Sequence, residues 1–77
     1  MDKQNPKNEH PRDRFKRLAT ARTNIVLKRL KVLGNCSNRQ IYEYEEVDID
    51  KIFSEIERKV KETKAKLHFP KKREFKL

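Results

Sequence analysis

Apolar residues recur at helical spacing in two separate stretches of this 77-residue chain, and a short polar connector divides the stretches. An advance of about 100° per residue gathers the apolar side chains of each stretch on one face. The first face comprises Phe15, Leu18, Ala19, Ile25, Val26, Leu30 and Leu33. The second, narrower stripe comprises Ile49, Ile52, Phe53, Ile56, Val60, Thr63 and Leu67. The spacing predicts two helices, over residues 12–33 and 48–68.

The residues that flank these stretches are typical of helix ends. Gly34 is the only glycine in the chain, and it follows the first stretch, where a left-handed residue commonly ends a helix. Asp48 is expected to cap free N–H groups at the start of the second helix. Pro70 is expected to end that helix, because proline lacks the N–H that the helix needs.

The fold class predicted from this pattern is all-α, an antiparallel two-helix hairpin with a structured connector and flexible basic termini. The predicted division is an N-terminal arm over 1–11, a hairpin domain over 12–68 and a basic tail over 69–77. Apolar residues make up only 34% of the chain and charged residues 43%. Two helices share a single seam, so a third layer is expected from the connector, a second copy or another macromolecule.

Positive charge is concentrated at the two ends of the sequence. Residues 1–33 carry ten Lys or Arg and three acids, for a net charge of +7. Residues 34–56 have a net charge of −4, and residues 57–77 have +6, which gives the chain its total of +9. Such a distribution attracts polyanions to particular parts of a protein.

The sequence therefore favours a small, non-enzymatic nucleic-acid-binding accessory protein, in which basic side chains contact phosphates. RNA within a ribonucleoprotein is favoured over DNA, because flexible basic extensions suit irregular RNA and no helix-turn-helix or basic zipper is visible. The candidate phosphate-binding residues are Lys16, Arg17, Arg22, Lys28, Arg29, Lys31, Arg39, Lys71, Lys72, Arg73 and Lys76.

Arg22 and Arg29 fall close to the centre of the first apolar face, at a seven-residue interval. Their stems could lie across the edge of a core while their heads reach water or a carboxylate. Alternatively, this face meets a phosphate or an acidic partner. The alternative function is accordingly a helical protein-interaction module that homodimerises or docks on and regulates an acidic protein.

The connector forms a possible recognition loop through Asn35, Asn38, Tyr42 and Tyr44. Asparagine side chains bond nearby backbone in turns. Aromatic side chains stack on unpaired bases. The structural alternative is that Ile41 and the tyrosines cover the open end of the hairpin.

Several function classes are disfavoured. Cys36 is a lone cysteine, and His10 and His68 lie far from it, so no catalytic or metal site and no cofactor are expected. No apolar run is long enough to span a membrane, and no signal segment follows Met1. A cytoplasmic protein without a membrane partner is therefore expected.

The segment "RFKRLATARTNIVLKRLKVLGNCSNRQIYEYEEVDIDKIF", residues 14–53, resembles a pattern in small uncharacterised proteins of bacteria and their mobile elements. In that group, an Arg-Phe…Leu-Ala…Arg helix runs into Leu-Gly-Asn-x-Ser-Asn, then Tyr-x-Tyr and a second helix. The resemblance implies a compact bacterial helical module with a defined connector, and it brings no assigned activity.

Overall fold

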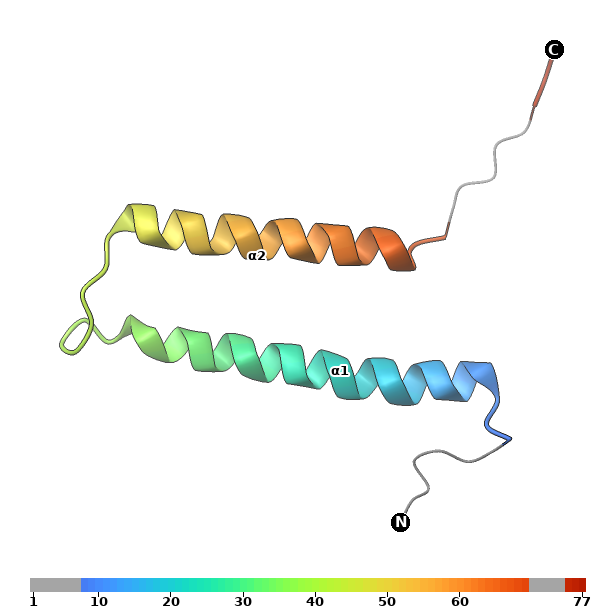
Figure 1. Ribbon diagram of the computed structural model, residues 1–77, viewed down its shortest axis with the longest axis horizontal. Coiled ribbons are helices and arrows are strands. Elements are labelled where there is room, and N and C mark those ends of the chain that lie inside the picture. Colours follow the sequence, from blue (N-terminus) through green and yellow to red (C-terminus); the bar gives the residue numbers. More distant parts are fainter. Residues whose placement is uncertain (1–7, 70–74) are drawn as a thin grey trace. The chain divides into compact units, whose positions relative to one another are not determined.

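The computed structural model describes residues 8–69 and 75–77 of the chain. Helix α1 spans Pro11–Gly34, the short 3-10 helix η1 spans Asn35–Ser37, and helix α2 spans Glu46–Leu67 (Figure 1). These described residues form no β-strand. The prediction of an all-α chain with two helices is confirmed, and each predicted helix end lies within two residues of the observed one.

Helix α1 begins at Pro11, whose fixed φ suits the first helical position and whose missing N–H would have no partner there. His10 precedes it as the N-cap, and its Nδ1 accepts a hydrogen bond from the Arg12 N–H at 3.0 Å. Within the predicted N-terminal arm, His10 thus caps the helix and Pro11 begins it. Residues 1–7 of that arm lie outside the described residues.

The end of α1 differs from the prediction. Gly34 is not left-handed: its φ of −61° and ψ of −21° are right-handed helical values, and it belongs to α1. The Asn35 N–H then donates to the Val32 carbonyl, and the backbone continues into η1. When the last turn tightens into a 3-10 helix, its carbonyl groups accept hydrogen bonds from N–H groups three residues later. No left-handed residue is then required to satisfy them.

The start of α2 is also placed differently. Glu45 is the N-cap, with extended backbone, and Asp48 is the third helical residue rather than the cap. The Asp48 carboxylate accepts a hydrogen bond from the Glu45 N–H at 2.9 Å, as in a capping box. Asp48 therefore stabilises the helix start from inside the first turn.

The face of α2 opposite its apolar stripe carries a network of ion pairs centred on Arg58. The Arg58 guanidinium contacts the carboxylates of both Glu55 and Glu62, and Lys59 lies 3.3 Å from Glu62. The sequence order predicts three other pairs, Glu55–Lys59, Glu57–Lys61 and Glu62–Lys66, and none of them is formed among these described residues. Arginine replaces them because its planar fork reaches one carboxylate on the preceding turn and one on the following turn.

The chain divides into two units, Met1–Tyr42 and Glu43–Leu77, each organised around one helix. No described residue is buried in either unit. The large apolar side chains stay half exposed, with Phe15 at 50% and Phe53 at 41%. An amphipathic helix gains most of its stability in proteins when its apolar face is covered. The antiparallel packing of α1 on α2 stays a prediction.

Candidate nucleic-acid interface

Helix α1 is the most cationic element that the structure describes. It carries a single acid, Asp13, and eight bases, for a net charge of +7 over 24 residues. The bases are Arg12, Arg14, Lys16, Arg17, Lys28, Lys31, and the two stripe residues Arg22 and Arg29. At 1.5 Å per residue the helix is roughly 36 Å long, so cationic groups follow one another at short intervals along it.

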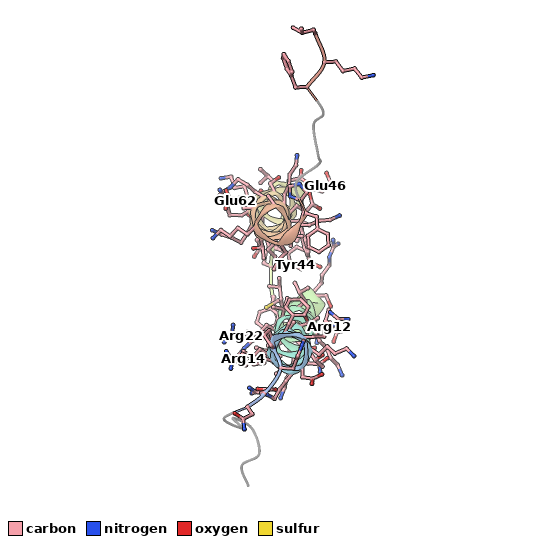
Figure 2. All side chains as sticks on the ribbon, turned by 90° about the vertical axis from the view of Figure 1, so that its right-hand side faces the viewer. Arg12, Arg14, Arg22, Tyr44, Glu46 and Glu62 are labelled. Atoms are coloured by element: carbon pink, nitrogen blue, oxygen red, sulfur yellow. The ribbon has the colours of Figure 1, made fainter. Side chains whose placement is uncertain are left out.

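These cations project around the helix rather than along one side. Figure 2 shows Arg14 and Arg22 on one side of α1 and Arg12 on the other. All eight bases except Arg17 are exposed. A nucleic acid could therefore contact α1 from more than one direction, and phosphates on two strands could be reached together.

Arg17 is engaged at the start of the helix. Its Nε and Nη2 atoms donate to the two carboxylate oxygens of Glu9, at 3.0 and 2.7 Å. Arg14 lies farther from the same carboxylate, at 3.9 Å. The hydrogen bonds from Arg17 lower the pKa of Glu9 below its ordinary value of 4.5, and the carboxylate in turn raises the pKa of Arg17. Arg17 is thus a weaker phosphate-binding candidate than the exposed bases.

Arg22 and Arg29 are both exposed, and neither makes an ion pair with another described residue. Both lie on the face that also presents Phe15 and Leu33. Arginine combines a planar cationic head with apolar stem atoms. This face can therefore meet a base or a sugar with its apolar side chains and a phosphate with its arginines.

Arg12 and Arg14 were missed by the sequence prediction, although both are exposed cations of the first turn. Both precede the first apolar residue of the stripe, so their position relative to the stripe does not single them out, whereas a charge pattern taken from the helix start includes them. Of the predicted tail residues, Lys76 is exposed, whereas Lys71, Lys72 and Arg73 lie outside the described residues.

The connector contains a compact turn built on Asn38. The Asn38 side-chain oxygen accepts from the Gln40 N–H at 3.0 Å, and its carbonyl accepts from the N–H groups of Ile41 and Tyr42. The prediction that this asparagine bonds nearby backbone is confirmed. Ile41 is 69% exposed and Tyr44 is half-buried.

The other predicted loop residues, Asn35 and Tyr42, are exposed, and so is Arg39. Asn35 belongs to η1, whereas Tyr42 and Tyr44 follow the turn in irregular backbone. The predicted loop residues thus lie in three consecutive segments: η1, the turn at Asn38, and the irregular backbone before α2. Their role in base recognition, or in covering the end of a hairpin, stays a prediction.

Residues 8–69 and 75–77 hold no group of three or more His, Cys, Asp or Glu side chains arranged to bind a metal ion. Neither α1 nor α2 has an apolar stretch that could cross a bilayer.

Comparison with protein-family models, with curated proteins and with solved structures found no match for this chain. The resemblance to small bacterial and mobile-element proteins therefore stays a prediction.

Proposed function

We propose that this protein is a non-catalytic nucleic-acid-binding accessory protein that contacts phosphates through α1. The observation that carries the proposal is the difference in charge between two helices of similar length. Helix α1 has a net charge of +7, whereas the six acids and six bases of α2 give that helix no net charge. Solubility alone would not require such an excess on one helix.

The mechanism is neutralisation of phosphates with release of counterions. The exposed lysines of α1 supply point charges, and its arginines supply planar forks that hold a phosphate in two places. The stripe residues Arg22 and Arg29 place such forks among apolar side chains, where contact with bases and sugars adds to the electrostatic attraction. Lys76 and the remaining tail bases extend the same contacts.

RNA is the favoured nucleic acid within this proposal. The connector between α1 and α2, residues 35–45, is longer than the three- or four-residue turn of a helix-turn-helix motif. A basic helix followed by an irregular loop suits a structured RNA or a ribonucleoprotein surface. A cytoplasmic location remains part of this proposal, and phosphate binding by α1 does not require that α1 packs on α2.

The test is the salt dependence of binding, measured by fluorescence anisotropy with a labelled duplex and a labelled RNA stem-loop. Neutralisation of about six phosphates on duplex predicts a log–log slope of about −5. A slope near zero, or no binding at low salt, would overturn the proposal. A slope that persists after truncation at residue 69 would assign the contacts to α1 rather than to the tail.

The second candidate function, a protein-interaction module, is favoured by one specific observation. Helix α2 has no net charge, and its apolar stripe is exposed except at Ile56, which is half-buried. A surface of this kind suits a protein partner better than a polyanion.

A further inference from the structure

Six residues of α2 repeat at alternating intervals of four and three along the helix. They are Ile49, Phe53, Ile56, Val60, Thr63 and Leu67. This alternation is the heptad spacing of a helix that packs along another helix. Ile49 is 36% exposed and Leu67 63% exposed, and Ile56 is half-buried. The stripe thus has the spacing of a helix-pairing seam and no cover within the described residues of its own unit.

Thr63 is the one polar member of the stripe, and its hydroxyl already has a partner. Its Oγ1 donates to the Lys59 carbonyl of the preceding turn at 2.8 Å. A buried hydroxyl is costly only when it lacks a hydrogen bond. Thr63 can therefore present its methyl group to a second helix without leaving a polar group unsatisfied.

Charge along α2 is divided into two opposite halves. Residues 46–57 carry five acids and one base, for a net charge of −4. Residues 58–67 carry five bases and one acid, for +4. This polarity complements the helix dipole, and it also makes an antiparallel copy of the same helix the matching partner.

We propose that the apolar stripe of α2 is the seam of a symmetric homodimer, in which it packs antiparallel against α2 of a second copy. In this orientation each acidic half lies along a basic half. A parallel pair would instead align like charges over its whole length. Antiparallel packing on α1 would align the basic half of α2 with residues 11–22 of α1, which have a net charge of +4. Only the antiparallel copy matches charge at both ends.

The heptad spacing also fixes the register of the proposed pair. Maximal overlap places Ile49 opposite Leu67 of the partner subunit, Phe53 opposite its Thr63, and Ile56 opposite its Val60. The two-fold axis then passes close to residue 58, as a symmetric dimer requires. On one edge of the seam, Asp50 lies beside Lys64 of the partner subunit, and the symmetry repeats this pair.

Symmetry also brings two residues close to their own copies. Lys59 approaches its own copy on the edge opposite the Asp50–Lys64 pair, but its charge is already shared with Glu62 at 3.3 Å. Glu57 approaches its own copy on the other edge, and this contact is a like-charge one. Substitution of Glu57 should therefore strengthen the dimer. Because residue 57 lies opposite its own copy only in this register, it can also be used to test the register.

The first test is the molar mass of the nuclease-treated full chain, measured by sedimentation equilibrium. A dimer is expected, and Ile56→Asp should abolish it. Asp50→Lys should raise the dimer dissociation constant about tenfold, because two attractive pairs become repulsive. The double variant Asp50→Lys/Lys64→Asp should restore the dimer. A monomer at every concentration would overturn the proposal in favour of cover by α1, and a dimer indifferent to these changes would overturn the assigned seam.

Cross-linking tests the orientation. In a Cys36→Ser background, Glu57→Cys should form an interchain disulfide under mild oxidation, because residue 57 lies opposite its own copy. Asp50→Cys is the matched control and should not cross-link, because it lies opposite residue 64. Equal cross-linking at both positions would indicate a parallel pair and contradict the proposal. None of these measurements depends on nucleic-acid binding.

Discussion

Helices α1 and α2 are similar in length and both are amphipathic, yet their charges differ completely. Helix α1 has two arginines within its apolar face and a net charge of +7, whereas the stripe of α2 contains no charged residue and the helix has no net charge. Apolar spacing is enough to predict that both are helices. The charge pattern is what distinguishes the partners that we propose for them: a polyanion for α1 and another helix for α2.

The two helices also differ in how they neutralise their own charges. On α2, Arg58 forms ion pairs with Glu55 and Glu62 on the face opposite the apolar stripe, so acids and bases neutralise each other locally. Figure 2 shows Glu46 and Glu62 on opposite sides of this helix. On α1, the ion pairs between described residues involve only Glu9, at the helix start. Most of the positive charge of α1 remains available to a ligand.

The largest expected effect is that of Phe53→Ala. If the α2 stripe is covered in the assembled protein, this change should lower the free energy of unfolding by about 3–5 kcal/mol. Urea unfolding followed by circular dichroism measures it, at a fixed protein concentration. Phe15→Ala on α1 is the matched control and should cost less than about 1 kcal/mol, because the arginines keep that face partly in water. A gain in helicity for Phe53→Ala would show that α2 is uncovered, since alanine is the better helix former.

The next effect sharpens the assignment of phosphate binding to α1. Replacing Lys16, Lys28 and Lys31 by glutamine should flatten the log–log salt slope by about 2–3 and weaken binding roughly a hundredfold near physiological salt. The control replaces three lysines of α2, at positions 51, 61 and 66, and should leave the slope nearly unchanged. Equal effects of the two triple variants would remove the functional distinction between the helices.

A smaller effect is expected at the end of α1. Gly34→Ala should raise the free energy of unfolding by about 0.5–1 kcal/mol, because Gly34 has right-handed helical backbone and alanine is the better helix former. A methyl group there would meet no atom within 4 Å. Thermal unfolding measures the change. Destabilisation would instead indicate that Gly34 adopts a left-handed conformation.

The smallest effect concerns the pH dependence of the first turns of α1. Because Arg17 holds the pKa of Glu9 below 4.5, their interaction is fully present above that pH and is lost as pH falls through the lowered pKa. An NMR titration of the Glu9 carboxylate should give a midpoint below 4.5, and Arg17→Gln should return the midpoint toward that value. An identical midpoint in the two proteins would exclude the ion pair.

The sequence predicted the two helices because their periodicity is local and nearly complete. Three details at or near the helix ends escaped it for physical reasons. Gly34 can adopt left-handed or right-handed helical backbone at little cost, so the presence of glycine alone does not predict which conformation it has. Asp48 can cap a helix from outside or support its first turn from inside. The Glu9–Arg17 contact joins residues eight apart across a helix start, where no periodic pattern applies.

The candidate site was predictable to the extent that it depends on charge alone. Lys16, Lys28 and Lys31 could be assigned to an exposed helix from their positions in the sequence. The engagement of Arg17 by Glu9 could not, because it depends on the path of the chain before Pro11. Local apolar spacing also does not predict which surface covers each apolar face. Charge complementarity between whole helices is the feature that bears on this question.

The division of roles between the helices is tested most directly by residue-resolved NMR. An unlabelled RNA stem-loop is titrated into the ¹⁵N-labelled full chain at low salt, and the amide shifts of every residue are followed. The account predicts that shifts concentrate on α1, around Arg22, Lys28 and Arg29, while residues 49–67 of α2 change little. Shifts concentrated on α2, with α1 unaffected, would contradict it.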